Sequence, residues 1–572
     1  MHPLCLIDAI GPFFRELTKR TINWSKIPFE HLRDADDEQW KRIHQDLLGF
    51  ARRVGEMGFN AATLDDVWHL VDHEGYEPEV RTCISRYRTE FRQCFATLRA
   101  HGLQVFVTMD FFASTAAMRT RLQQEHITPL EFTAQVLERF LADFPEVSGV
   151  IVRIGESDGR DVNDDFRSEL LLQKPKQANA FLKHLLPLFE KHERKLIFRT
   201  WTVGAYPIGD LMWHRETFAQ VLEGIDSRAL IVSMKYGESD FFRYLPLNRN
   251  FFRTKVAKII ELQTRREYEG CGEYPSFVGW EYERYLQELR QADNVVGCMI
   301  WCQTGGWVPF RRLAFIDDTA LWTELNTFVT LRVFKDQSLV EDAVREFASR
   351  IGCEDANALI ELLRLSDEVI RELLYVEEFA RQKLFFRRLR IPPMLQVYWH
   401  NIFISHSVRR ILRFFVQDHD GCMRAAHRAM DRLAQMKMLA IKAGLPVADI
   451  EFMQDTFALL VLAREYAFTD DSEAMQMRIR EAKRAYKQKY PKSGPRYRYR
   501  VKLDFTPLML QPRYLRWGIN LLFRRQRGYR LVDRLITLHL LSLIYRLIAK
   551  RRPQWVPSFA KDSAMGVDVV FR

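Results

Sequence analysis

The sequence predicts an α/β fold: a (β/α)8 TIM barrel followed by an all-α domain and a basic amphipathic C-terminal tail. Three observations support this prediction. Short β-branched or aromatic runs alternate with amphipathic helical stretches over residues 1–330, long helical patterns replace them over residues 331–490, and the excess positive charge falls in residues 491–572. At roughly 100–200 residues per domain, a chain of 572 residues has room for these three parts.

Strand-like segments recur across residues 1–330. The first strand is either Leu4–Ala9 or Thr21–Trp24. Seven further strands are expected at Phe59–Leu64, Gln104–Asp110, Gly149–Ile154, Lys195–Thr200, Leu230–Met234, Ile259–Thr264 and Val295–Trp301. Seven or eight such units in roughly 300 residues favour a closed barrel over an open doubly wound sheet. No glycine-rich phosphate-binding motif follows the first strands, so we exclude nucleotide binding.

Amphipathic helices fill the intervals between these strands and then dominate the chain. The helices expected within the barrel are Asp37–Glu56, Glu79–His101, Pro129–Phe144, Gln177–His192 and Gly279–Gln291. Those expected in the next domain include Leu339–Ile351, Ala356–Val376, Met423–Ala443 and Ser472–Tyr490. The strand signal disappears there, which predicts an all-α domain. Pro491–Pro495 then interrupts the helical pattern, and the tail begins.

The C-terminal tail carries the positive charge of the protein. Residues 491–572 hold 18 of the 85 Lys and Arg residues and 4 of the 74 Asp and Glu residues, so the tail has a net charge of +14 and residues 1–490 have −3. Within the tail, the apolar segment Leu535–Ala549 is too short and too charged for a typical membrane span. Two interpretations stay open: an interfacial helix on an anionic membrane surface, or a core helix packed on the helical domain.

Composition and short motifs bear on several other classes. The eight cysteines form no CxxC pair and no zinc-like Cys/His spacing, so we expect buried reduced thiols, no metal and no cofactor. Met1–Phe14 lacks the pattern of a secretory signal, which predicts a cytoplasmic protein, peripheral at the inner face of the membrane if the tail binds lipid. The slightly acidic first 490 residues argue against a nucleic-acid partner. A homodimer is compatible with the sequence.

Polar and aromatic residues cluster at the predicted C-terminal ends of the strands, where TIM-barrel active sites lie. In chain order they are Asp65, Asp66, Asp110, Arg153, Glu156, Arg199, Trp201, Lys235, Asp240, Glu267 and Trp301. Separated carboxylates can serve as general acid and general base at a glycosidic bond. The three cations suit an anionic substrate, and Trp201, Trp301 and Trp307 offer stacking surfaces for sugar rings. The other interpretation is an ordinary network of salt bridges at the rim of a barrel.

Six segments follow one another in a recognisable order. They are Gly58–Val67 (GFNAATLDDV), Gly102–Phe111 (GLQVFVTMDF), Phe144–Glu156 (FPEVSGVIVRIGE), Phe198–Trp201 (FRTW), Met234–Phe241 (MKYGESDF) and Glu261–Gly270 (ELQTRREYEG). These segments resemble motifs of the α-glucuronidases of glycoside hydrolase family 67, in which the last reads approximately EVQITQEYTG. Gln337–Leu374 also resembles the start of that family's helical C-terminal domain, so the resemblance covers roughly residues 20–400.

The resemblance implies an activity and roles for individual residues. The activity is that of an inverting glycoside hydrolase acting on a glycan or oligosaccharide with an acidic, uronic sugar. The family's general acid maps onto Glu156, and the residues that act with the attacking water map onto Asp240 and Glu267. The basic residues that hold the glucuronate carboxylate map onto Arg153, Arg199 and Lys235. Asp65, Asp66, Asp110, Trp201 and Trp301 complete the expected substrate-binding set.

The chain departs from that family in four ways. We expect it to lack the family's N-terminal β-sandwich domain, and its basic tail is unlike the family. The acid loop RIGESDG is one residue longer than the family's KANSEG, so Asp158 competes with Glu156 for the role of acid. Asp65 and Asp66 stand where the family has amides, which argues against an identical substrate. The alternative functions are therefore a noncatalytic glycan-binding or envelope and polysaccharide-assembly protein on a glycosidase-like barrel, and a peripheral membrane scaffold.

Overall fold

The computed structural model forms two compact units. It describes residues 3–15, 27–155, 165–202, 206–303, 312–386, 389–394, 396–398, 401–496, 498–507, 509, 511–524 and 538–556. The first unit comprises Met1–Glu238, Leu247–Arg265 and Trp280–Ser338, and the second comprises Ser239–Pro246, Arg266–Gly279 and Leu339–Arg572. Two short segments that follow barrel strands thus belong to the second unit. The division of the chain at residues 330 and 490 stays a prediction.

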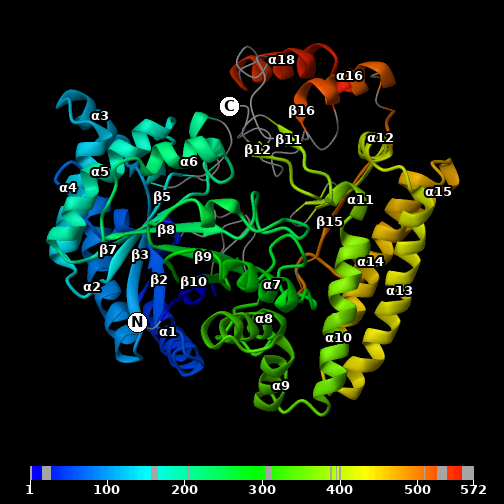
Figure 1. Cartoon of the computed structure of the whole chain (residues 1–572), viewed down its shortest axis with the longest axis horizontal. Coiled ribbons are helices and arrows are strands. Elements are labelled where there is room, and N and C mark those ends of the chain that lie inside the picture. The colour runs from blue at the N-terminus through cyan, green and yellow to red at the C-terminus, as the bar shows by residue number, and fades with distance from the viewer. Residues whose placement is uncertain are drawn as a thin grey trace. The chain divides into compact units, whose positions relative to one another are not determined.

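Eight parallel strands close into a barrel in the first unit (Figure 1). They are β1 (Leu4–Asp8), β2 (Ala61–Asp65), β3 (Gln104–Asp110), β5 (Gly149–Arg153), β7 (Lys195–Arg199), β8 (Leu230–Lys235), β9 (Lys258–Gln263) and β10 (Val295–Trp301). Each strand pairs with the next along the chain, and β1 pairs with β10 to close the ring. The predicted TIM barrel is confirmed. Its first strand is Leu4–Asp8, and Thr21–Trp24 lies outside the described residues.

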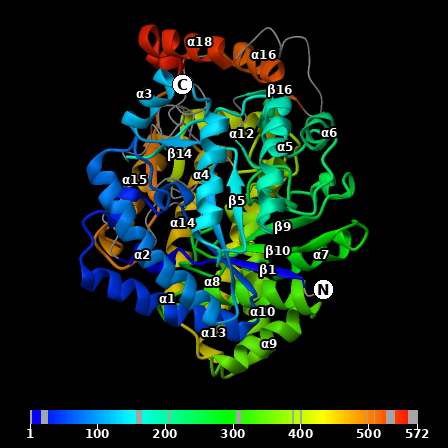
Figure 2. The same ribbon diagram turned by 90° about the vertical axis from the view of Figure 1, so that its left-hand side faces the viewer.

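Helices connect the strands and cover the outer face of the barrel. They are α1 (Asp37–Met57), α2 (Pro78–Ala100), α3 (Ala116–Gln124), α4 (Pro129–Asp143), α5 (Pro175–Lys191), α6 (Arg215–Leu222), α7 (Gly279–Leu289) and α8 (Leu321–Leu331). Figure 2 shows α4 and α5 in front of β5. All residues of β2 and β5 are buried, as expected for parallel strands covered on both faces, and this burial explains their nearly continuous apolar runs.

Local signals in the sequence set the ends of these helices. The Asp36 side chain accepts a hydrogen bond from the backbone N–H of Gln39 at 2.7 Å and caps the start of α1. The same helix ends at Gly58, whose φ of +103° lies in the region that favours glycine. In α4, Thr128 and Glu131 form a reciprocal capping box. Such caps explain why the predicted helix bounds lie close to the observed ones.

The connection between β8 and β9 differs from the other βα units. Residues 236–257 are all described, and they contain a short 3-10 helix, Arg249–Phe252, but no α-helix. Two buried asparagines support this connection, because the side-chain amides of Asn248 and Asn250 donate to the Met212 carbonyl at 2.7 and 3.0 Å. These side-chain hydrogen bonds thus tie the connection to the backbone of the loop between β7 and β8.

The second unit is mainly helical. Its longer helices are α9 (Val340–Arg350), α10 (Ala356–Val369), α12 (His406–Phe415), α13 (His419–Lys442), α14 (Val447–Phe468) and α15 (Glu473–Lys489). Helix α13 packs against both α10 and α14 (Figure 1). The helical region that the sequence predicts is therefore confirmed. Helix α14 buries apolar side chains on all sides, so its sequence has little amphipathic periodicity.

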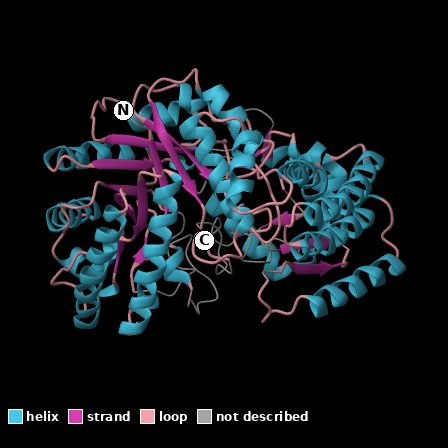
Figure 3. Cartoon of the chain, turned by 90° about the horizontal axis from the view of Figure 1, so that it is seen from below, coloured by secondary structure: helices cyan, strands magenta, loops and turns pink. Residues whose placement is uncertain are grey.

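Two small sheets accompany these helices, and the sequence analysis does not predict them. One sheet has the order β12 (Leu389–Arg390), β11 (Phe385–Phe386), β16 (Phe523–Arg524), and the other has the order β13 (Val397–Tyr398), β14 (Asn401–Ser405), β15 (Arg500–Asp504). Figure 3 shows their strands among the helices. Strand β11 pairs with residues 137–139 positions later, and β14 pairs with residues 99 positions later, so local sequence does not reveal these sheets.

The C-terminal tail folds in part onto the second unit. Besides β15 and β16, it contains α16 (Pro512–Leu522) and α18 (Leu538–Arg551). Leu515 and Ile519 of α16 pack with a hydrophobic cluster that includes Phe415 and Phe468. Residues 535–537, with which the predicted segment Leu535–Ala549 begins, lie outside the described residues. Among the described residues, no helix is both long enough and apolar enough to cross a membrane.

The cysteines have the surroundings of structural thiols. All eight are free, and the first unit buries five of them, namely Cys5, Cys83, Cys94, Cys298 and Cys302. Cys5 on β1 is level with Cys298 on β10 at the pairing that closes the barrel. Cys271, Cys353 and Cys422 are half-buried. The expectation of buried thiols thus holds for the barrel, whereas these other three reach the surface in part.

Candidate active site

Every strand of the barrel ends in a polar residue or a tryptophan. From β1 to β10, these residues are Asp8, Asp65, Asp110, Arg153, Arg199, Lys235, Gln263 and Trp301, and we call them the strand-end ring. Each is at most 5% exposed. Because neighbouring strands follow this order around the barrel, three carboxylates on β1–β3 adjoin three cations on β5, β7 and β8. The ring therefore has an acidic half and a basic half.

A buried ion pair dominates the basic half. Arg199 donates from Nε and Nη2 to the two carboxylate oxygens of Glu261, at 2.9 and 2.7 Å. The Ser233 hydroxyl and the Trp301 indole N–H donate to the same carboxylate at 2.7 and 3.1 Å. Burial by itself raises the pKa of Glu261, but Arg199 and Lys235 outweigh it, so the pKa lies below its usual value. Glu261 is therefore ionised at neutral pH.

The other two cations of the basic half also have close partners. Arg153 donates from Nε to Asp110 at 2.9 Å, and the Ser168 hydroxyl bonds to the same carboxylate. The Nζ atom of Lys235 lies 3.8 Å from the centre of the Trp201 ring, a cation–π contact. Arg153 is level with Arg199 in the strand register, and Lys235 is level with Glu261. Three cations thus stand near two carboxylates, Asp110 and Glu261.

Trp301 contacts this ion pair from β10. The Cζ atom of Arg199 lies 4.8 Å from the centre of one of its rings, and its indole N–H holds Glu261. The side chain is buried. Trp301 therefore positions the Arg199–Glu261 pair, whereas the sequence analysis assigns it a sugar-stacking role.

The acidic half contains carboxylates with different surroundings. Asp8 accepts hydrogen bonds from the backbone N–H groups of Cys302 and Gln303 at 2.7 and 3.0 Å, so it ties the end of β1 to the loop after β10. Asp66 accepts from the N–H of Trp68 at 3.1 Å and caps a short 3-10 helix. Asp65 is buried beside it, and the peptide bond that joins the two aspartates is cis. Asp8 and Asp66 thus have structural partners that spacing alone does not reveal.

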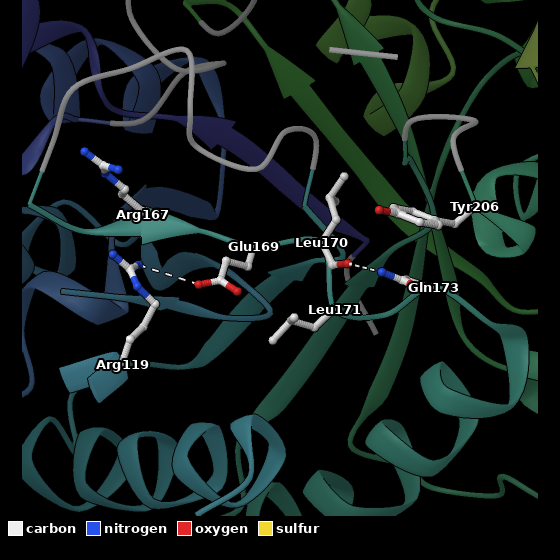
Figure 4. A pocket seen from close by; sticks show the side chains of 7 residues that line it. All are labelled: Arg119, Arg167, Glu169, Leu170, Leu171, Gln173 and Tyr206. Carbon is white, nitrogen blue, oxygen red and sulfur yellow. Dashed lines mark hydrogen bonds and ion pairs between the residues drawn. The ribbon is translucent and has the colours of Figure 1, made fainter. Parts of the chain in front are cut away.

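A pocket of about 410 Å³ opens among the loops at the same end of the barrel (Figure 4). Its lining residues are Arg119, Arg167, Glu169, Leu170, Leu171, Gln173 and Tyr206. They belong to the connections that follow β3, β5 and β7. Arg119 lies 3.6 Å from Glu169, and the Gln173 amide donates to the Leu170 carbonyl at 3.3 Å. The exposed Arg167 and the ring of Tyr206 give this pocket a cation and an aromatic face.

Both candidates for the general acid, Glu156 and Asp158, lie outside the described residues, as does Trp307. The chain enters the acid loop through Gly155, two residues after the end of β5. Its φ is +110°, and a Cβ atom there would lie 2.9 Å from the side chain of Leu170. The positive φ favours glycine at this position, because any other residue would be strained there.

The two residues assigned to the attacking water, Asp240 and Glu267, belong to the second unit. Asp240 accepts a hydrogen bond from the Tyr268 hydroxyl at 2.6 Å and another from the N–H of Phe241 at 2.9 Å. Both acids are buried. In the chain, Asp240 follows the end of β8 by five residues and Glu267 follows the end of β9 by four. Tyr268 thus orients Asp240 and is itself the neighbour of Glu267.

Glu269, two residues beyond Glu267, is a buried acid that the sequence analysis misses. It accepts hydrogen bonds from Arg266 at 2.5 and 3.0 Å and from Arg243 at 3.2 Å. Ser276 and Tyr375 donate to it at 2.5 and 2.7 Å. Burial opposes ionisation, but the two arginines lower its pKa to about 2. Structural donors occupy both oxygens, so Glu269 stabilises the second unit.

Across the ranges that the structure describes, no group of three or more His, Cys, Asp and Glu side chains has a geometry that could hold a metal ion.

Comparisons with known proteins give only distant likenesses. No family model and no curated protein matches the chain. A GH138 enzyme targeting pectin rhamnogalacturonan II has a TM-score of 0.49 and 11% identity over 86% of this chain and 62% of that one, so this chain spans less than two thirds of its length. CpGH84B has a TM-score of 0.37 and 9% identity, and the match covers 78% of this chain and 71% of that one. A β-mannanase from the blue mussel Mytilus edulis has a TM-score of 0.34 and 11% identity, over 59% of this chain and 94% of that one. The resemblance to family 67 stays a prediction.

Proposed function

We propose that this protein is an inverting, α-glucuronidase-like glycoside hydrolase that acts on a glycan or oligosaccharide with an acidic, uronic sugar. The observation that carries the proposal is the division of the strand-end ring into an acidic and a basic half. Such a ring stands at the end of the barrel where TIM-barrel enzymes act. Its burial makes each charge costly without a partner, so a ring of six charged residues calls for a function.

The basic half accounts for the acidic sugar. Arg153, Arg199 and Lys235 are three cations, and the carboxylates bonded to the two arginines are Asp110 and Glu261. Arg153 and Arg199, which are level on adjacent strands, would present planar donors to the two oxygens of a uronate carboxylate. Trp201, which lies against Lys235, would then flank the sugar ring.

The reaction needs an acid and a base on opposite faces of the sugar. Glu156, or Asp158 in its place, would donate a proton to the leaving glycosidic oxygen as its bond to the anomeric carbon breaks. Asp240, assisted by Glu267, would take a proton from the water that attacks this carbon. Inversion requires roughly 6.5–9.5 Å between the acid and base carboxyl groups. The Tyr268 hydroxyl and the backbone N–H of Phe241 would keep the Asp240 carboxylate in place for this step.

The pocket at Arg167 and Tyr206 supplies room for more than one sugar. It lies among the loops at the same end of the first unit as the strand-end ring. An aromatic face suits the apolar side of a pyranose ring, and an arginine suits a second carboxylate. We therefore assign the substrate class as an acidic oligosaccharide or polysaccharide.

The deciding experiment measures hydrolysis of uronic-acid oligosaccharides and of their neutral counterparts by the full chain. NMR would follow the anomeric configuration of the product, and the first product should have the configuration opposite to that of the substrate. Glu156→Gln and Asp158→Asn distinguish the two candidate acids, because the variant that lacks the true acid should hydrolyse the substrate roughly 10²–10⁴-fold more slowly. Asp226→Asn, which changes an exposed acid of the first unit, serves as the matched control and should retain the wild-type rate.

The same panel tests the alternative of a noncatalytic glycan-binding protein. A ligand that binds the native state raises the melting temperature even when no bond is cut. Stabilisation by uronic acids without product would replace the hydrolase by a glycan-binding or polysaccharide-assembly protein. If no acidic sugar stabilises the protein and none is hydrolysed, both functions are rejected.

A further inference from the structure

Helix α18 exposes an apolar stripe. Leu540, Leu543, Ile544 and Leu547 follow the i, i+3, i+4, i+7 spacing of one helix face, and each is at least 40% exposed. The opposite face includes Tyr545 and Ala549, which are half-buried. An ordinary solvent-facing helix carries polar residues on its outer face, whereas α18 carries leucine and isoleucine there. The expectation of a core helix therefore accounts for one face of α18 and leaves the other without an explanation.

Helix α16 exposes aromatic rings between arginines. Its inner face packs Leu515 and Ile519 into the hydrophobic cluster of the second unit. Its outer face carries Trp517, 65% exposed, and Tyr514, 52% exposed. Arg513 and Arg516 are exposed on the same helix. Trp and Tyr beside basic residues are typical of side chains at the boundary between water and lipid headgroups. Figures 1 and 2 both show α16 next to α18.

The charge around these two helices is strongly one-sided. Residues 505–556 contain 11 Lys and Arg residues and a single acidic residue, Asp533. Lys550, Arg551 and Arg552 stand exposed at the C-terminal end of α18. Arg552 also lies over the half-exposed ring of Trp555, at 5.8 Å. An apolar stripe with cations at its end complements a surface that is negatively charged outside and apolar beneath.

We infer that α16 and α18 form a docking surface for an anionic phospholipid bilayer, on which α18 lies in the plane of the interface. The stripe of α18 would enter the boundary between headgroups and acyl chains, Trp517 and Tyr514 would lie at headgroup level, and the arginines and lysines would meet the lipid phosphates. This inference does not rest on the hydrolase activity, because it uses none of the residues of the strand-end ring.

Binding of the full chain to large unilamellar vesicles, followed by co-sedimentation, tests this surface. Vesicles of phosphatidylcholine with phosphatidylglycerol should bind the protein at low salt, and raising the salt should weaken the binding. Pure phosphatidylcholine vesicles should bind it at least about tenfold more weakly, because the attraction of the basic residues is lost. The double variant Leu543→Ser/Leu547→Ser should lose at least about tenfold in partition coefficient, and Trp517→Ser should lose less.

A matched control makes the result specific. Met438 and Ile441 on α13 are also exposed apolar residues of the second unit, at 67% and 53%, so Met438→Ser/Ile441→Ser should bind vesicles as wild type does. Circular dichroism establishes that each variant keeps its helices. Equal binding of wild type and of the Leu543→Ser/Leu547→Ser variant would overturn the inference. So would a concentration-dependent dimer, seen by light scattering without lipid, that this variant abolishes, since a second copy would then be the occupant.

Discussion

Arg199 on β7 and Glu261 on β9 form a two-point ion pair that reaches across the intervening strand β8. Both carboxylate oxygens are engaged, at 2.9 and 2.7 Å, and Ser233 of β8 donates to the same carboxylate from between the two strands. The pair is buried, so water cannot solvate either charge if the other is removed. It joins three neighbouring strands at the end of the barrel where the other ring cations lie.

The first prediction concerns the cost of breaking this pair. Arg199→Met leaves the Glu261 carboxylate buried without its main partner and should lower the free energy of unfolding by about 3–5 kcal/mol. Arg199→Met/Glu261→Met removes both charges and should recover much of this loss. Urea denaturation measures both values. The matched control is Arg228→Met, an exposed arginine of the same unit that should change stability little. A double variant no more stable than Arg199→Met would contradict the ion-pair explanation.

Acid sensitivity of the second unit should depend on Glu269. Its pKa in the folded protein is about 2, below the ordinary 4.5, so its contribution to stability is complete above about pH 4.5 and is lost as the pH falls toward 2. That contribution amounts to roughly 3 kcal/mol. Glu269→Gln should be less stable than wild type at pH 7, and its stability should fall less steeply below pH 4.5. Stability measured across this pH range checks the prediction, and parallel curves for the two proteins would refute it.

Tyr268 should matter for turnover through Asp240. Tyr268→Phe removes the hydroxyl that bonds to Asp240 at 2.6 Å but keeps the ring, which stacks on Phe242 at 4.2 Å. We expect kcat on a hydrolysed uronic substrate to fall about tenfold, as for the loss of one hydrogen bond to a charged group, with KM little changed. Asp240→Asn should lose more, about 10²–10⁴-fold. A Tyr268→Phe enzyme with wild-type kcat would remove Tyr268 from this positioning role.

The pocket at Arg167 should discriminate by substrate length. Arg167→Ala should weaken the binding of acidic oligosaccharides about tenfold, because a charge-assisted hydrogen bond is lost, while the binding of a single uronic acid stays unchanged. Isothermal titration calorimetry measures both affinities. Arg228→Ala, a change of an exposed arginine outside the pocket, is the control. An equal loss for the monosaccharide and the oligosaccharide would show that the pocket is not a separate subsite.

The barrel could be predicted from sequence because each strand has a recognisable local sequence pattern. Gln104–Asp110 and Val295–Trp301 are observed with the predicted bounds, and the ends of Gly149–Arg153 and Lys195–Arg199 differ by one residue from prediction. A buried parallel strand is a short apolar run ended by a polar residue, and this signal needs no knowledge of the partner strand. Active sites of TIM barrels lie at the C-terminal ends of the strands, which singles out residues there as site candidates. Six predicted site residues are strand-end residues in the structure, namely Asp65, Asp110, Arg153, Arg199, Lys235 and Trp301.

The interaction partners of these strand-end residues could not be predicted from the sequence. Glu261 lies within one of the six motifs, but no local pattern indicates that Arg199, 62 residues earlier, binds it. Asp8 went unnoticed at the end of β1, because its function as an anchor for the loop after β10 spans 294 residues. Glu267 and Glu269 share one motif, and only the positions of Arg243, Arg266 and Tyr375 separate a structural acid from a candidate catalytic one.

By itself, the sequence determined the order of strands and helices, the polar character of the strand ends and the placement of positive charge in the tail, since periodicity, burial and charge are properties of neighbouring residues. The tertiary structure decided which charges neutralise one another and which apolar faces stay exposed. Arg199 pairs with Glu261 and the α18 stripe reaches the surface because closing the barrel and folding the second unit bring together residues far apart in the chain. Such long-range contacts depend on the whole fold, and no local pattern records them.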